Sequence, residues 1–238
     1  MRNVLAIFQR EFSGYFNSAL AYIIIPIFLV LVGGFSLFFQ DIFAQGVASM
    51  RTVFFWCAAF FLLLIPAVTM RLFAEEQRTG SIELLVTMPI TESEMVLGKY
   101  FAALALMTIA LALTISYPIT LAQHGALDWG PVAGGYLGLF LLGASFTAIG
   151  TAASAVTRNQ VIAFLIALVV CLVPFASGFA LSRVPATMLP LVQFLSFDYH
   201  FNNLSRGVID SRNVLYYGSV IALFLHLAVF NLERRRLS

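Results

Sequence analysis

Residues Arg71 to Lys99 read RLFAEEQRTGSIELLVTMPITESEMVLGK, and the runs on both sides of this stretch are apolar. The stretch contains five of the chain's eleven acidic residues and three basic ones. An ionised side chain costs several kcal/mol in hydrocarbon, so we expect the stretch to lie outside the membrane, between two spans. Its charged residues are Arg71, Glu75, Glu76, Arg78, Glu83, Glu92, Glu94 and Lys99.

The pattern within this loop predicts a short amphipathic helix with a break on each side. Gly80 follows a helical pattern that ends at Thr79, as a C-cap glycine does. Ser81 is then placed to cap a second helix that has Glu83 in its first turn, where the helix dipole favours a carboxylate. Pro89 ends this helix because it cannot donate a backbone hydrogen bond. The apolar residues at helical spacing in it are Ile82, Leu85 and Val86.

A longer helix is expected to begin at about Glu92. Thr91 and Glu94 form the capping box T-E-S-E, and Ile90 and Met95 are placed as its hydrophobic staple. The loop pattern is therefore helix, break, short helix, break, helix. Such a loop is suited to docking against a soluble partner. The alternative is a solvated connector that only joins two spans.

The composition of the whole chain is that of a polytopic membrane protein. Of its 238 residues, 61% are hydrophobic and 10% are charged, whereas a soluble domain carries about 25% charged residues. The formal net charge of +2 is too small to indicate nucleic-acid binding. Cys57 and Cys171 lie in apolar runs, where two buried small side chains are favoured over a disulfide. The N-terminus does not have the pattern of a cleaved signal peptide.

We expect an all-α membrane protein with about six transmembrane helices in one domain over residues 1–238. Residues 1–18 are amphipathic and predict an N-terminal helix in the membrane interface, with a restart at Asn17-Ser18. Residues 71–95 form the charged loop, and residues 182–213 form a short helical segment on the opposite side of the membrane. The expected spans are Leu20–Phe39, Val53–Met70, Val96–Leu121, Val132–Val156, Val161–Leu181 and Val214–Leu232.

Lysine and arginine predict the orientation, because they are enriched in cytoplasmic loops. The bias places both termini and the 71–95 loop in the cytoplasm, and residues 182–213 outside it. Trp129 and the pair Tyr216-Tyr217 lie at span ends, as interfacial aromatic residues do. The basic residues expected inside are Arg2, Arg10, Arg71, Arg78, Lys99, Arg158 and Arg234–Arg236, and those expected outside are Arg51, Arg183, Arg206 and Arg212.

Small and apolar residues indicate how the helices pack. Gly134 and Gly138 have GxxxG spacing, for which packing within the bundle is favoured over a seam between subunits. Prolines within or near the ends of spans predict kinks. Within 182–213, apolar side chains at helical spacing allow the segment to lie on the outer surface or to dip partway into the bundle. These apolar residues are Phe194, Phe197, Phe201, Leu204 and Val208, and the prolines are Pro26, Pro66, Pro118 and Pro174.

Side chains that could act in catalysis or bind a metal ion form no convincing motif, and we expect no catalytic or metal site. The chain has no G-x-x-x-x-G-K-[ST] motif, so it cannot cradle ATP phosphates in that way. Asp198 and His200 are too few for a metal site, and a solvated helix face is favoured for them. His226 lies in the sixth span, where a neutral histidine hydrogen-bonded within the bundle is favoured over a functional site. Ser145 with His226 would suit a rhomboid-type serine protease, but Phe146 follows where that motif has glycine.

Two blocks of the sequence resemble known permeases. Glu76 to Leu85 has the pattern E-x-x-x-G-S-x-E-L-L, followed by P-[IV]-[ST] and a Gly-Lys pair before the next span. This block resembles the cytoplasmic loop of type 2 (ABC-2) permeases of ATP-binding-cassette (ABC) exporters. A second block, Ser196 to Tyr217, reads SFDYHFNNLSRGVIDSRNVLYY. It resembles the last extracytoplasmic segment of the gliding-motility-associated permease subgroup.

The resemblance implies the membrane subunit of an ABC exporter in the bacterial cytoplasmic (inner) membrane, which drives export or envelope remodelling. Such a permease pairs with a second permease subunit, as a homodimer or heterodimer, and with separate ATPase subunits that bind the ATP and magnesium. A periplasmic or envelope partner is compatible with this role. A secondary transporter is the alternative, but the spans contain almost no charged residues and no repeat is evident. The residues that the resemblance implies in partner docking are Glu75, Glu76, Arg78, Gly80, Ser81, Glu83, Leu84, Leu85 and Pro89, with Gly80 to Pro89 as the coupling helix.

Overall fold

A computed structural model describes residues 2–40, 49–80, 90–123, 125–180, 185, 187–208 and 210–236. These residues form helices joined by turns, and no strand occurs among them. The helices are α1 (Arg2–Asn17), α2 (Ala19–Gln40), α3 (Arg51–Thr69), α4 (Arg71–Thr79), α6 (Glu92–Leu113), α7 (Ser116–Ala122), α8 (Trp129–Val156), α9 (Gln160–Ala180), α10 (Leu189–Leu195), α11 (Phe197–Ser205) and α12 (Ser211–Arg236).

Six helical segments in the described ranges are long and apolar enough to cross a membrane. They coincide with the six spans expected from the sequence, so the predicted fold class, an all-α membrane protein, is confirmed. The segments are Ala19–Ser36, Arg51–Thr79, Glu92–Ala122, Trp129–Val156, Gln160–Phe179 and Ser211–Arg234.

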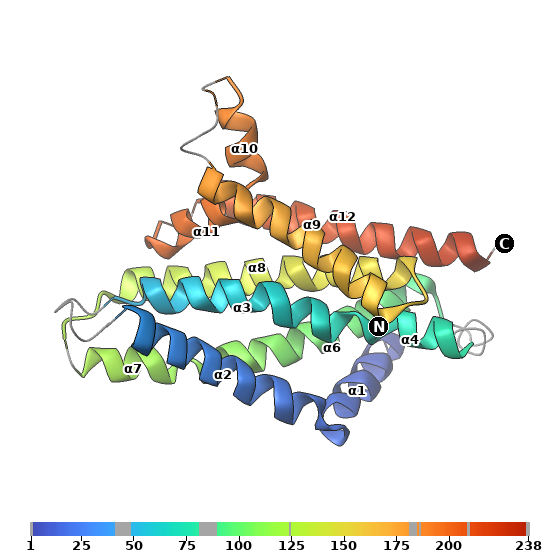
Figure 1. The fold of residues 1–238 in the computed structure, drawn as a ribbon. Coiled ribbons are helices and arrows are strands. Elements are labelled where there is room, and N and C mark those ends of the chain that lie inside the picture. Colours follow the sequence, from blue (N-terminus) through green and yellow to red (C-terminus); the bar gives the residue numbers. More distant parts are fainter. Residues whose placement is uncertain are drawn as a thin grey trace.

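Helix α8 lies at the centre of the bundle, and α3, α9, α11 and α12 pack against it (Figure 1). Its small residues allow this close packing. A Cβ atom at Gly143 would lie 2.6 Å from Cε of Met107 on α6, and one at Gly138 would lie 3.1 Å from the Phe201 ring on α11. Gly134 faces the backbone of α11 in the same way. The GxxxG pair therefore packs within one chain, as predicted.

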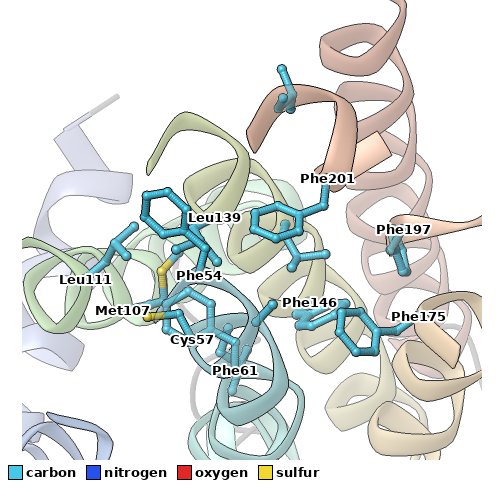
Figure 2. Close-up of a cluster of buried hydrophobic side chains, with 14 of the residues drawn as sticks. Phe54, Cys57, Phe61, Met107, Leu111, Leu139, Phe146, Phe175, Phe197 and Phe201 are labelled. Carbon is cyan, nitrogen blue, oxygen red and sulfur yellow. The ribbon is translucent and has the colours of Figure 1, made fainter. Parts of the chain in front are cut away.

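A large apolar core lies between α2, α3, α6, α8, α9, α11 and α12, and it contains many aromatic side chains (Figure 2). Phe146 of α8 meets Phe197 of α11 edge to face, with the ring centroids 5.5 Å apart, an arrangement that aromatic pairs favour. Cys57 and Cys171 belong to this core as free, fully buried thiols. The prediction that both cysteines are small buried side chains is confirmed.

The third predicted span is broken near its end, where α6 stops at Leu113 and α7 begins at Ser116. Pro118 has no N–H to donate to the carbonyl of Thr114, four residues earlier. The hydroxyl of Tyr136 on α8 donates to that carbonyl at 2.9 Å instead. The backbone N–H of Tyr117 also donates to this carbonyl at 2.9 Å, so the oxygen has a backbone donor as well as the Tyr136 hydroxyl.

The segment after α9 contains two short helices, α10 and α11. Ser196 begins α11 as its N-cap, because its hydroxyl accepts the backbone N–H of Tyr199 at 3.3 Å. Helix α11 packs against α8 and α9. Its apolar face, formed by Phe197, Phe201 and Leu204, is buried. Of the two arrangements left open by the sequence, α11 adopts the one that packs into the bundle, whereas Phe194 and Val208 on either side of it are exposed.

Tyr216 and Tyr217 do not form the interfacial aromatic belt that the sequence predicted. Both are buried in the core. The Tyr216 hydroxyl donates to the carbonyl of Leu195 at 2.8 Å, and the Tyr217 hydroxyl donates to that of Phe197 at 3.0 Å. The pair therefore fastens the junction of α10 and α11 to α12. Trp129, at the start of α8, is 56% exposed, as an interfacial residue should be.

Helix α1 ends at Asn17 and α2 begins at Ala19, so the predicted restart is confirmed. Helix α1 packs on the first half of α6. Gly98 permits this approach, since a Cβ atom there would lie 2.7 Å from Cβ of Ile7. Both ends of the chain lie toward the end of the bundle that carries α4, whereas α7 and α11 lie toward the opposite end (Figure 1). A second apolar cluster joins α1 and α4 to the ends of α3, α8 and α12.

Candidate partner-docking site

Helix α4 follows α3 after a break at Met70. The hydroxyl of Ser154 on α8 donates to the Met70 carbonyl at 3.1 Å and accepts the backbone N–H groups of Phe73 at 2.8 Å and Ala74 at 3.1 Å. It therefore stands between the Met70 carbonyl and the Ala74 N–H, which would bond to each other in a continuous helix. A side chain inserted into the helical hydrogen-bond ladder is a recognised cause of a kink.

One face of α4 is fixed to the bundle. Leu72, Phe73 and Ala74 are buried, and the side-chain amide of Gln77 donates to the carbonyl of Ala155 at 3.0 Å. Together with Ser154, these contacts hold α4 along the last turn of α8. A force applied to α4 would therefore reach the central helix of the bundle directly.

Lys99 joins three helices beside this contact. Its side chain is 3% exposed, and its ammonium lies 3.0 Å from Oε1 of Glu11 on α1 and 2.8 Å from Oε1 of Glu76 on α4. The ammonium is also 5.3 Å from the centroid of the Phe73 ring, within range of cation–π attraction. Two carboxylates and a ring thus surround one buried cation. Glu76, which the resemblance implies in partner docking, thus anchors α4 within the chain.

The opposite face and the end of α4 are exposed. Gly80 has φ 73° and caps the helix in the left-handed conformation that a C-cap glycine adopts. Glu75 and Arg78 are exposed, so a partner can reach both an acidic and a basic group there. The other residues expected in docking, Ser81, Glu83, Leu84, Leu85 and Pro89, lie outside the described residues.

The far side of the loop is also fixed, at the start of α6. The predicted capping box is confirmed: Thr91 Oγ1 accepts the Glu94 N–H at 3.3 Å, and Glu94 Oε2 accepts the Thr91 N–H at 3.2 Å. Asn3 on α1 donates to the same carboxylate oxygen at 3.0 Å. The loop therefore leaves from one defined helix end and returns to another.

His200 is a structural residue and not part of a solvated face, so that prediction was wrong. Its side chain is buried, with Nδ1 2.8 Å from Oδ1 of Asn213 and Nε2 3.1 Å from the carbonyl oxygen of Phe194. The ring also stacks on Tyr216 with the centroids 4.0 Å apart. Among the described residues, no group of three His, Cys, Asp or Glu side chains could hold a metal ion.

His226 is exposed on α12, so the favoured prediction of a histidine hydrogen-bonded within the bundle was wrong. Ser145 is buried in α8, and its hydroxyl donates to the carbonyl of Leu141 in the same helix at 3.0 Å. No hydrogen bond joins the two side chains in the described part of the chain. The geometry gives no support to a serine–histidine dyad.

Sequence reasoning missed the roles of three residues in this site. Ser154 and Gln77 bind backbone groups of distant helices, and no local pattern marks such contacts. Lys99 was grouped with the charged loop, although it lies inside α6 and is buried. Its one sequence signal is a charge at the start of an apolar run, which in a membrane protein calls for a nearby counter-charge.

The six candidate spans, with the anchored helix α4 at the end of the second, define a multi-span membrane protein. The family model of the ABC-2 family transporter protein matches residues 58–237, and the chain belongs to this family. It is accordingly an ABC transporter permease, the kind of membrane subunit that works with an ABC ATPase. A search of curated proteins finds no significant match.

Proposed function

We propose that the chain is the permease subunit of an ATP-driven exporter in the bacterial cytoplasmic membrane, with both termini and α4 in the cytoplasm. A second permease subunit, identical or different, and separate ATPase subunits would complete the complex. Its work would be export of a compound or remodelling of the envelope. The resemblance of Ser196 to Tyr217 supports membership of the gliding-motility-associated permease subgroup.

The observation that carries the proposal is the two-sided character of α4. One face is held to α8 by Ser154 and Gln77 and to α6 by Lys99, and the other face exposes Glu75 and Arg78. A connector that only joined two spans would not need so many fixed contacts. An ATPase docked at the end of α4 would move this helix, and the anchors would transmit the movement to α8 and α6.

The mechanism would be a shift between two populations of the bundle. Closure of the ATPase dimer on ATP would favour one position of α4, and release would favour the other. We assign ATP and magnesium to the partner, because this chain has no phosphate loop. We therefore expect the purified permease to hydrolyse no ATP on its own, and turnover by the isolated subunit would contradict the proposal.

Substitution of Gly80 tests the docking surface. Valine in the left-handed conformation is strained by about 1–2 kcal/mol, which would redirect the chain after α4 without unfolding the bundle. We expect Gly80→Val to reduce ATP turnover stimulated by the permease when it is co-expressed with its ATPase. Gly218→Val is the matched control, because Gly218 is exposed and has no positive φ, and a Cβ atom added there would meet nothing within 4 Å.

Charge reversal provides a second test of the same surface. Arg78→Glu changes an exposed side chain, so the fold should persist, whereas a like-charge contact at a docking surface can cost several kcal/mol. Glu83→Lys is expected to act in the same way from its place in the predicted coupling helix. Wild-type co-purification and wild-type stimulated turnover in all three docking variants would leave the loop as a simple connector.

A further inference from the structure

A polar cavity of about 280 Å³ lies between α1, α4 and α6, on the side of α4 that faces the N-terminal helix. Lys99 lies in its wall and pairs with two carboxylates, those of Glu11 and Glu76. With Arg10, Arg71 and Glu75, the lining has three cationic and three anionic side chains. Arg10 and Arg71 also line the cavity, and both are exposed. No ion pair joins either arginine to another described residue, so two guanidinium groups are available there.

Tyr15 adds a buried hydrogen-bond donor to this cavity. The residue is 5% exposed, and its hydroxyl oxygen has no hydrogen-bond partner among the described residues. Burial is the main cause that raises the pKa of this phenol, so the hydroxyl stays protonated. A buried hydroxyl without a partner is costly and uncommon. A rotation of the phenol that opened this hydroxyl to the cavity would let it donate to an acceptor oxygen of a ligand.

An apolar groove of about 370 Å³ adjoins this cavity and shares Arg71 with it. The groove is lined by Ser18, by the first residues of α2 and by Ala67 of α3. Ile23, one of the residues of α2 in this groove, is 54% exposed. Cationic groups at one end and hydrocarbon-facing side chains at the other fit an amphipathic anion. The site lies where the amphipathic helix α1 meets two spans, at the level expected for lipid head groups.

We propose that this combined site binds one anionic phospholipid from the bilayer, with its phosphate at Arg10, Arg71 and Tyr15 and one acyl chain in the groove beside α2. Guanidinium groups hold phosphate oxygens through short, charge-assisted hydrogen bonds. Glu75 also lines the cavity, but it is exposed, so solvent weakens its repulsion of the phosphate. The bound lipid would brace α1 against α4, next to the proposed docking surface.

The proposal is tested on the full-length permease, purified in detergent and stripped of lipid. Phosphatidylglycerol and phosphatidylcholine with the same acyl chains are titrated, and bound lipid is measured by native mass spectrometry. We expect clear preference for phosphatidylglycerol, and a loss of about tenfold in its affinity in Arg71→Gln and in Arg10→Gln, since each removes a charge-assisted contact. Arg158→Gln is the matched control, because Arg158 is exposed just after α8 and does not line the site.

Tyr15→Phe separates this site from general surface charge. It removes only the hydroxyl, so the lipid-free variant should unfold at the same temperature as wild type or higher, while the temperature rise on adding phosphatidylglycerol should shrink. Equal affinities for the two lipids, or equal losses in Arg158→Gln and Arg71→Gln, would overturn the proposal. Displacement of the lipid by millimolar inorganic phosphate would instead assign the cavity to a soluble anion and also overturn it.

Discussion

A single ammonium group, that of Lys99, connects α1, α4 and α6. Its partners Glu11 and Glu76 have side chains that are 20% and 14% exposed, so the whole cluster is largely shielded from water. A buried ion pair is weak evidence of net stabilisation, because desolvation offsets most of the attraction. Removing Lys99 is different, since Glu11 and Glu76 then both lose the cation that they share. The cluster of Lys99, Glu11 and Glu76 therefore holds α4 in position against α1 and α6.

Lys99→Met should therefore destabilise the protein strongly. It keeps the length of the side chain but leaves two neighbouring carboxylates without their cation, for which we expect a cost of about 3–5 kcal/mol. Thermal unfolding of the purified protein in detergent measures the effect. Arg158→Met removes an exposed cation at the same end of the bundle and should change the stability by no more than about 0.5 kcal/mol. Equal unfolding temperatures for both variants would contradict the anchoring role of Lys99.

Asp198 gives a prediction that depends on pH. Burial in α11 raises the pKa of this carboxyl above its usual value, so the folded state favours the neutral form. Such a group contributes stability that is complete below its unfolded pKa and is lost as the pH rises through the folded pKa. We expect Asp198→Asn to raise the unfolding temperature at neutral pH, and the gain to disappear in acid.

The control for this experiment is an exposed carboxyl on another helix. Glu75 on α4 is exposed, and Glu75→Gln should have a small effect at either pH. If Asp198→Asn lowered the unfolding temperature at neutral pH, the ionised carboxylate would be stabilising and the sign of the argument would be wrong.

At the scale of elements, the break in helical hydrogen bonding between α3 and α4 is made by a residue of a third helix. Pro66 lies too early to break the chain at Met70, because the Met70 N–H still bonds to the Pro66 carbonyl at 2.9 Å. The break comes from the Ser154 hydroxyl, which takes the place of the local hydrogen bonds. The break at Met70 therefore depends on the packing of α8 against this segment and not on the sequence around Met70 alone.

Ser154→Ala should change the direction of α4. It would leave the N–H groups of Phe73 and Ala74 without their partner, at about 1–3 kcal/mol for each group that stays unsatisfied. The helix can escape this cost by rejoining α3 as one straighter helix. We expect a shift in the distance distribution between spin labels at Arg78 and Arg206, measured by pulsed electron resonance.

Ser145→Ala is the matched control for this measurement. It makes the same change in the same helix, but the Ser145 hydroxyl only donates to a carbonyl of α8 itself. Both labelled positions are exposed, whereas Cys57 and Cys171 are fully buried and out of reach of the label. An unchanged distance in Ser154→Ala would show that α4 is directed by its other contacts.

At the scale of the whole molecule, the features that could be predicted are those specified by residues close together in the sequence. Apolar runs of about 20 residues define the spans, and the Gly80 C-cap and the Thr91 capping box follow from neighbouring residues. The kink at Met70 could not be predicted, because Ser154 lies 84 residues away in the sequence. The partners of Lys99 were missed for the same reason, since Glu11 is 88 residues distant. Hydropathy likewise gives no sign that Tyr216 and Tyr217 turn inward to bind carbonyls of α10 and α11.

The orientation of the bundle is the remaining prediction at this scale. The end of the bundle that carries α4 also holds Arg2, Arg10, Arg158 and Arg234, which favours its location in the cytoplasm. We expect a cysteine that replaces Arg78 to be protected from a membrane-impermeant maleimide in intact cells and to react after lysis. A cysteine that replaces Arg206, which is exposed toward the α11 end, should react in intact cells. Each position is the other's control, because both are exposed side chains on the same chain. The reverse pattern of labelling would place α4 outside the cell, where no ATPase could reach it. That result would contradict both the predicted orientation and the proposed coupling to an ATPase.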